Sequence, residues 1–291
     1  MVVALLVAVV VLGVIFVWNL GSVLIAPANH PLGRPPANLP VQAVEFSSAS
    51  GATVHGWLVP GQPGKGAVVL LHGNRASRLV MLSRAEFLSR AGYAVLLIDF
   101  QAHGESLGKN LTFGFLESRD VTAAVQFVRE RCPGESIGVL GISLGAAAAL
   151  LAEPPLPVQA LVLESCYPTI YQATEDRLVM RFGWPGRLAT PLLTCQLPFR
   201  LGVVPADLQP IRHVGNIRVP KLFIAGTEDR DTTLPESRAL FAAAAGPKQF
   251  WPVTGAAHVD MHAFNKAGYE TRVLDFLAAN LPPPRPLEPK P

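Results

Sequence analysis

Gly141-Ile142-Ser143-Leu144-Gly145 is a G-x-S-x-G pentapeptide in a chain of 291 residues. The apolar residues 136–140 before it predict a buried strand, and the Ala-rich residues 146–152 after it predict a helix. A serine on such a strand-to-helix turn lies in strained backbone, and the flanking glycines remove side chains that would clash there. The pattern therefore predicts a nucleophilic Ser143 with the backbone N–H of Leu144 facing a developing oxyanion, a structural turn serine being the alternative.

On both sides of this turn, strand-like runs alternate with helical stretches. Residues 42–48 and 53–59, around Ser50-Gly51, predict a hairpin. Further strands are expected at residues 67–71, 94–98, 137–140, 160–163, 221–225 and 249–253, and helices at 79–91, 115–131, 234–245 and 269–281. This order predicts an α/β fold, with a mainly parallel sheet, leading antiparallel strands and helices on both faces.

Residues 167–215, which we name the cap segment, interrupt this alternation. They contain aromatic residues and several prolines but no clear strand. Their position between two parallel strands predicts a cap inserted over the carboxyl ends of the sheet, where ligands bind in such folds. A long excursion packed on the side of the domain is the alternative. The apolar residues that could line a pocket, or simply pack the cap, are Phe182, Trp184, Leu192, Leu193, Leu197 and Phe199.

A serine nucleophile needs a base and an acid that orients this base. His258 lies in a small-residue loop after the strand expected at 249–253, so it should reach the sheet edge where Ser143 emerges. The acid should follow the strand expected at 221–225. Asp229 is the preferred candidate there, with Glu228 and Asp231 as lesser candidates.

A second oxyanion donor is expected in the turn after the strand at 67–71. The sequence Leu71-His72-Gly73-Asn74 occupies this position, which makes the backbone N–H of Asn74 the candidate. Two such donors stabilise a tetrahedral intermediate strongly, because removing one of them costs about 2.7–4 kcal/mol in other enzymes.

Together these motifs resemble those of the alpha/beta-hydrolase superfamily, within it the membrane-anchored or secreted serine hydrolases with a cap, identified by sequence as serine aminopeptidase-like. The matching pieces are His72-Gly73-Asn74, Asp99 with His103-Gly104-Glu105-Ser106, the pentapeptide 141–145, Gly226-Thr227-Glu228-Asp229 and Gly255-Ala256-Ala257-His258. The resemblance covers about residues 41–281. It implies the fold, with Ser143 as nucleophile, Asp229 as acid and His258 as base. Nothing in the sequence supplies a site for the free amine of an aminopeptidase substrate.

Composition excludes several other classes of function. The net charge is only +3, and no basic run interleaved with aromatic residues appears, which disfavours nucleic acid as a partner. The sequence contains no H-E-x-x-H, Walker or Rossmann pattern, so we expect no metal and no cofactor. Of the three cysteines, Cys166 and Cys195 could pair in an oxidising compartment, but free thiols are favoured.

The first 28 residues differ from the rest of the chain. They are apolar to about residue 26 and carry no charged side chain, which predicts a single-pass transmembrane anchor and hence the membrane as a partner. A cleaved signal peptide, with Ala26-Pro27-Ala28 as cleavage site, is the alternative and would make the domain secreted or periplasmic. A buried core helix is the third interpretation of this segment. We expect a linker at 29–40, the hydrolase domain at 41–281 and a Pro-rich tail at 282–291.

These observations predict a serine hydrolase that cleaves carboxylic esters or thioesters through an acyl-enzyme. The apolar cap segment favours a small-molecule ester or lipid-like substrate with an apolar acyl group. A peptidase or amidase of the same fold uses the same machinery, and a noncatalytic binding protein of this fold is a further alternative. The oligomeric state stays open.

Overall fold

The computed structural model describes residues 2–37 and 39–283, apart from the side chains of residues 6, 9 and 10. Residues 284–291 of the expected tail lie outside the described residues. The strands are β1 (Ala28–Asn29), β2 (Gln42–Ser47), β3 (Thr53–Val59), β4 (Ala67–Leu71), β5 (Ala94–Ile98), β6 (His103–Gly104), β7 (Ile137–Ile142), β8 (Ala160–Glu164), β9 (Lys221–Gly226) and β10 (Lys248–Val253). The helices are α1 (Val2–Ile25), α2 (Leu82–Arg90), α3 (Glu117–Arg131), α4 (Leu144–Leu151), α5 (Ile170–Phe182), α6 (Pro185–Thr194), α7 (Leu197–Leu201), α8 (Pro210–His213), α9 (Leu234–Ala243), α10 (Met261–Phe264) and α11 (Lys266–Asn280).

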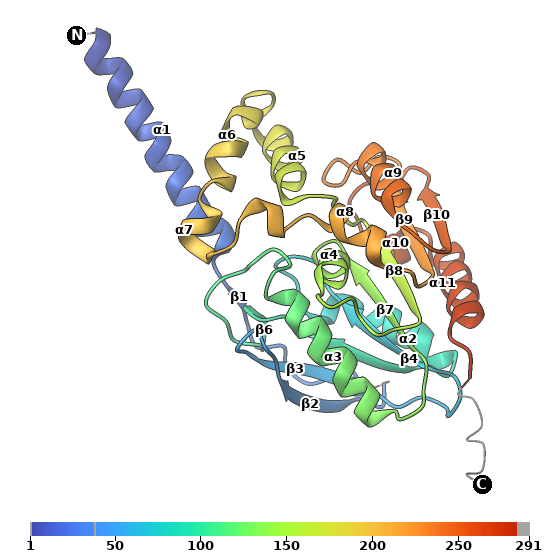
Figure 1. Ribbon diagram of the computed structural model, residues 1–291. Helices are drawn as coiled ribbons and strands as arrows, with labels where there is room; N and C mark the ends of the chain where they lie inside the picture. Colours follow the sequence, from blue (N-terminus) through green and yellow to red (C-terminus); the bar gives the residue numbers. More distant parts are fainter. Residues whose placement is uncertain (1, 38, 284–291) are drawn as a thin grey trace.

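Eight strands form one sheet in the order β10-β9-β8-β7-β4-β5-β3-β2 (Figure 1). Strand β3 runs antiparallel to both of its neighbours, β2 and β5, and all other adjacent pairs are parallel. This architecture confirms the predicted α/β fold with a mainly parallel sheet and leading antiparallel strands.

Helices cover both faces of the sheet. Apolar residues of α3, α4 and α9 form a core on one face, and those of α2 and α11 form a core on the other. Successive residues of a strand enter opposite cores: Val69 and Leu71 pack on the first face, Val68 and Leu70 on the second. Because both faces are buried, these strands consist of uninterrupted apolar residues, and their positions could be read from the sequence.

The cap segment connects β8 to β9 and carries α5 to α8. Helices α5 and α6 pack against each other, and α6 also contacts α1. Figure 1 shows α5, α6 and α7 standing apart from the sheet, on the same side of the molecule as α1. The cap segment and the N-terminal helix are therefore neighbours, although more than 140 residues separate them in the sequence.

The structure contradicts the expected single-pass membrane anchor. Among the described residues, no helix is long and apolar enough to cross a membrane. Helix α1 covers most of the apolar segment, but its last turns are used within the protein, where Gly21 and Ile25 are buried. The prediction of an anchor is therefore wrong.

The cysteines do not form a disulfide. All three lie within the described residues as free thiols, Cys166 buried and Cys195 exposed. Burial raises the pKa of the Cys166 thiol, which keeps it protonated and unreactive.

Candidate active site

Ser143 lies on a strained turn between β7 and α4. Its φ is 50° and its ψ is −109°, a conformation that residues with a side chain rarely adopt. The turn is possible because its neighbours are glycines: a Cβ on Gly145 would overlap Leu71 O and His72 O, and one on Gly141 would lie 2.5 Å from Ala146 N. The pentapeptide is therefore required by close backbone packing.

The backbone of this turn is held by the neighbouring strand, whereas the Ser143 hydroxyl does not cap its own helix. Ser143 N–H donates to Glu164 O at the end of the adjacent strand β8, at 2.8 Å. Although Ser143 is the N-cap residue of α4, its side chain makes no capping hydrogen bond. A serine at this position normally caps its helix, so the free Oγ is consistent with another role.

His258 and Asp229 meet at the carboxyl edge of the sheet, as their positions after β10 and β9 require. His258 Nδ1 donates to Asp229 Oδ2 at 2.8 Å. This bond orients the imidazole and leaves Nε2 as the nitrogen that can accept a proton. The His258 side chain is 26% exposed, whereas Asp229 is buried.

Asp229 is held as a carboxylate by its neighbours. Its Oδ1 accepts the backbone N–H groups of Asp231 and Thr232 at 2.8 and 2.9 Å, and its Oδ2 accepts the Thr232 hydroxyl at 2.9 Å. Burial alone would raise the pKa of Asp229, but the bond to His258 and the bonds from Thr232 outweigh it and lower this pKa below its ordinary value.

The two lesser acid candidates are directed elsewhere. Asp231 pairs with Arg177 Nε of α5 at 3.2 Å, and Glu228 is exposed. Of the three acids in this loop, the structure brings Asp229 into hydrogen-bond contact with His258.

The expected oxyanion residues, Asn74 and Leu144, line one pocket together with Ser143. Leu144 is the first residue of α4, so its N–H has no partner within the helix and lies at the positive end of the helix dipole. Asn74 lies in the turn after β4, and the preceding Gly73 is close enough that an added Cβ would lie 3.8 Å from Ser143 Cβ.

His72 holds this turn in place. Its Nδ1 donates to Gly73 O at 2.7 Å, and its Nε2 accepts the backbone N–H of Phe100 at 3.1 Å. Burial, with His103 nearby, lowers the pKa of His72 to about 3. The ring is therefore neutral and has both nitrogens occupied, so we interpret it as a structural support of the turn that carries Asn74.

The pocket above Ser143 has a volume of about 200 Å³ and mostly apolar walls. Helix α5 supplies the largest share of its lining, and Leu20 and Leu24 of α1 also line it. Of the apolar cap residues named from the sequence, Phe182 and Leu193 reach this pocket and Leu197 reaches a smaller one beside it. Trp184, Leu192 and Phe199 are instead exposed.

A buried ionic cluster behind the site was not predicted from the sequence. Arg84 of α2 contacts Glu164 Oε1 at 2.9 Å and Asp260 Oδ1 at 2.9 Å, and Tyr269 donates to Glu164 Oε2 at 2.7 Å. The cluster joins the end of β8, whose carbonyl holds Ser143, to the loop that carries His258. Arg84 lies in an amphipathic helix, where an arginine is ordinarily a surface charge, so the sequence held no signal for this contact.

Metal ligation is not favoured at this site. The ligand atoms of Asp229, Asp231 and His258 lie within 4.8 Å of one another. However, His258 and Asp229 satisfy each other, and Asp231 pairs with Arg177. We therefore assign no ion to this group.

The chain is similar to known proteins over most of its length. The family model described as "Serine aminopeptidase, S33" matches residues 62–194. The uncharacterized protein MT2364 of Mycobacterium tuberculosis is 29% identical over 263 residues, which cover 88% of this chain and 86% of that protein. The uncharacterized protein YqkD of Bacillus subtilis is 24% identical over 239 residues, which cover 81% and 78% of the two chains.

Among solved structures, the esterase Pf2001 of Pyrococcus furiosus superposes with a TM-score of 0.74 at 24% identity, covering 89% of this chain and 98% of that one. At this identity the likeness shows the fold alone. The fold, the eight-stranded sheet and the matching S33 segment agree, and they confirm the resemblance seen in the sequence motifs. The chain has the alpha/beta-hydrolase fold, and the match of residues 62–194 to the S33 family model supports a hydrolase.

Proposed function

We propose that the protein is a serine hydrolase that cleaves carboxylic esters or thioesters with an apolar acyl group. The observation that carries this proposal is one pocket that is lined by Ser143, Asn74 and Leu144 and otherwise has mostly apolar walls. The end of this pocket at Ser143 is suited to a reacting carbonyl group, and its apolar walls are suited to an acyl chain.

In the proposed first half-reaction, Ser143 Oγ forms a bond to the acyl carbon while its proton passes to His258 Nε2. The carbonyl electrons move onto oxygen, which accepts the N–H groups of Asn74 and Leu144. Asp229 stabilises the resulting imidazolium through the 2.8 Å bond to Nδ1. The C–O bond (C–S in a thioester) then breaks, and His258 returns the proton to the leaving alcohol or thiol.

In the second half-reaction, water replaces the leaving group. His258 Nε2 takes a proton from the water, whose oxygen attacks the acyl-enzyme carbonyl, and the same two N–H groups hold the oxyanion. The bond between the acyl carbon and Ser143 Oγ then breaks, and His258 Nε2 gives its proton to Ser143 Oγ, which restores the hydroxyl and releases the carboxylic acid. No cofactor enters either step.

The pocket lining favours an ester over a peptide with a free amino terminus. The lining includes Arg177 and Arg181 but no Asp or Glu, so among the described residues no carboxylate is placed there to bind an ammonium group. The S33 family description names an aminopeptidase, which makes amide cleavage the alternative to test.

Labelling with a fluorophosphonate probe tests the nucleophile. We expect one adduct per chain, located on Ser143 by peptide mass spectrometry, and no adduct on Ser143→Ala or on heat-denatured protein. Folded wild-type protein that stays unlabelled beside a reactive control hydrolase would contradict the proposal.

A substrate panel tests the reaction class. p-Nitrophenyl esters of increasing chain length are compared with aminoacyl-p-nitroanilides at equal concentration. We expect ester cleavage to be faster, and faster cleavage of the anilides than of every ester would reject the ester assignment in favour of a peptidase.

A further inference from the structure

We propose that the last turns of the N-terminal helix α1 form a wall of the substrate pocket, and that Leu20 and Leu24 limit the length of the acyl chain. This inference rests on the proposed function, since it assigns a specificity role within the same site. It gives α1 a part in substrate selection.

The pocket lining is the first observation. Leu20 and Leu24 line the same pocket as Ser143, and their spacing of four residues places both on one face of α1. A second, smaller cavity of about 40 Å³ shares Leu24 with the first pocket and is also lined by Gly21 and Ile25. Together the two cavities therefore extend from Ser143 to the face of α1 that carries Leu24.

The cap segment holds α1 from one side. Arg200 of α7 donates to Trp18 O and, at 2.9 Å, to Ser22 Oγ, and its guanidinium lies 4.2 Å from the centre of the Trp18 ring. Gln196 donates to Val17 O at 3.3 Å. These contacts fix the rotation of α1, so that Leu20 and Leu24 face the pocket.

The turn that carries Asn74 holds α1 from the other side. Arg75 Nη1 donates to Ala26 O at 3.1 Å and to Val23 O at 3.4 Å. The last carbonyls of a helix have no partner within it and form the negative end of its dipole, so a cation is favourable there. Arg75 directly follows Asn74 and has a φ of 56°. The end of α1 is thus joined to the proposed oxyanion turn.

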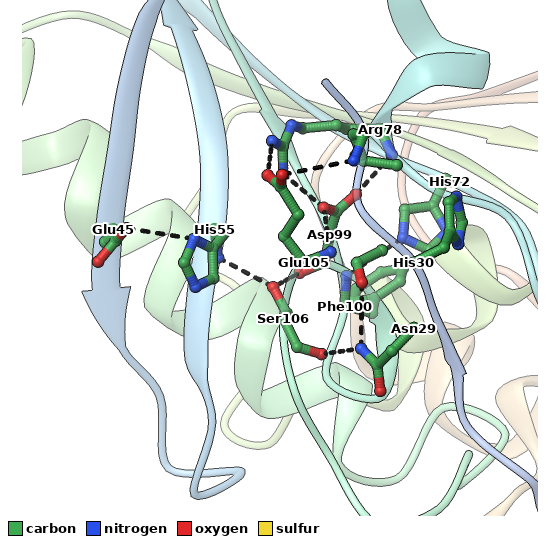
Figure 2. A network of polar contacts seen from close by, with 12 residues as sticks. Asn29, His30, Glu45, His55, His72, Arg78, Asp99, Phe100, Glu105 and Ser106 are labelled. Atoms are coloured by element: carbon green, nitrogen blue, oxygen red, sulfur yellow. Dashed lines mark hydrogen bonds and ion pairs between the residues drawn. The ribbon is translucent and has the colours of Figure 1, made fainter. Parts of the chain in front are cut away.

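The chain after α1 is fixed to the domain. Strand β1 pairs with β6, and Asn29 Nδ2 donates to Ser106 O at 2.8 Å. Figure 2 shows Asn29 and Ser106 beside the ionic contacts of Arg78 with Asp99 and Glu105. The segment that joins α1 to the domain therefore lies against a buried polar network. This contact favours a fixed position of α1 as a wall of the pocket.

An acyl chain bound at Ser143 would extend between α5 and the end of α1. Ile170 and Thr174 of α5 line both cavities together with Leu24, and Ala173 lines the first one. A larger side chain at residue 24 would shorten this space, and a smaller one would lengthen it. Short acyl groups would be affected little, since they stay close to the serine.

Leu24→Trp tests the inference, with Val23→Trp as the matched control. Val23 lies on the same turn but is 63% exposed and does not line the pocket, whereas Leu24 lines both cavities. For Leu24→Trp we expect kcat/KM for p-nitrophenyl octanoate to fall by about tenfold or more relative to the acetate ester. This is about the loss in kcat/KM that one to two badly accommodated methylene groups cause in an apolar pocket. Leu24→Ala should shift the preference toward longer esters, and Val23→Trp should keep the wild-type profile.

Equal chain-length profiles for Leu24→Trp and Val23→Trp would overturn the inference while ester cleavage itself persists. A second measurement does not depend on catalysis: binding of dodecanoate to Ser143→Ala by calorimetry. We expect Leu24→Trp in this background to weaken dodecanoate binding and Val23→Trp to leave it unchanged. Unchanged dodecanoate affinity in both tryptophan variants, or no dodecanoate binding in any variant, would overturn the inference. Failure of the proposed function would instead appear as absent labelling of Ser143 in the wild type.

Discussion

The carboxyl edge of the sheet and the cap segment with α1 form two sides of one pocket, but they are built differently. At the sheet edge, buried polar groups are paired, as in the bonds of Asp229 to the partly exposed His258 and of Arg84 to Glu164. In the cap segment, large apolar side chains remain open to solvent: Trp184 is 72% exposed and Phe199 83% exposed.

This difference indicates that the sheet edge and the cap segment with α1 have different tasks. Buried, hydrogen-bonded groups hold a geometry to a fraction of an ångström, as a proton transfer requires. Apolar walls without fixed polar partners impose volume and little direction, as a hydrocarbon chain requires. We therefore expect substitutions at the sheet edge to affect kcat, and those in the cap segment or α1 to affect the choice of substrate.

The largest effect is expected when the nucleophile or base is removed. Ser143→Ala and His258→Ala should each lower kcat by at least about 10⁴-fold, and the double variant should be hardly worse because the residues act as one unit. Steady-state kinetics on the best ester measures this, with circular dichroism as a control for folding. Losses that multiply in the double variant would show that the two residues act independently.

The acid is the next test of the sheet edge. Asp229→Asn removes the carboxylate that orients His258 and should lower kcat by about 10³–10⁴-fold. Asp231→Asn is the matched control two residues away and should change kcat by less than about threefold, since surface ion pairs contribute little. The opposite ranking of the two variants would make Asp231 the acid.

A smaller effect is expected in the cap segment. Leu178 is buried and lines the pocket, whereas Leu188 is 64% exposed and does not line it. Leu178→Ala should lower kcat/KM for an octanoate ester by about tenfold with little change for the acetate ester, and Leu188→Ala should change neither. A uniform loss over all chain lengths would indicate that Leu178 supports the fold of the cap segment and not selection.

The smallest effect concerns the boundary between the two regions, where Asp176 of α5 lies close to Glu236 of α9. Burial and the hydrogen bond to Glu236 raise the pKa of Asp176 to about 7. The folded protein thus holds a proton that the unfolded chain releases near pH ~4, so stability is lost as pH rises from about 4 to about 7.

Asp176→Asn removes this titration. We expect it to raise Tm by a few degrees at about pH 8, where the wild type carries the charge, and to have less effect at about pH 5. Thermal unfolding of both proteins at the two pH values is the measurement. An equal shift at both values would mean that the substitution acts through packing alone.

The fold could be predicted from the sequence because buried parallel strands are short apolar runs. Residues 67–71 and 94–98 are such runs, and both form strands with these bounds. The choice of Asp229 among three neighbouring acids also agrees with the contact to His258, because strand order and turn position constrain it.

The role of α1 could not be predicted from the sequence. The apolar composition of residues 1–26 does not by itself show whether the segment enters a bilayer or packs on a domain. Its position depends on two-residue strands such as β1, which carry no periodic signal, and on contacts from Arg75 and Arg200 that lie far away in the chain. For the same reason, the prediction of an anchor failed and β1 and β6 were not predicted, whereas the strands of the eight-stranded sheet were.

The glycine at position 145 has a consequence for how activity arises during folding. A Cβ at this position would overlap the carbonyl oxygens of Leu71, the last residue of β4, and of His72, both more than 70 residues earlier in the chain. The strained turn at Ser143 therefore packs directly against the end of β4, and we expect this turn to form only when β4 and β7 are paired. A nascent or partly unfolded chain would carry an ordinary, unreactive serine. Labelling of this serine would then count native molecules, and loss of labelling during denaturation should coincide with loss of the sheet.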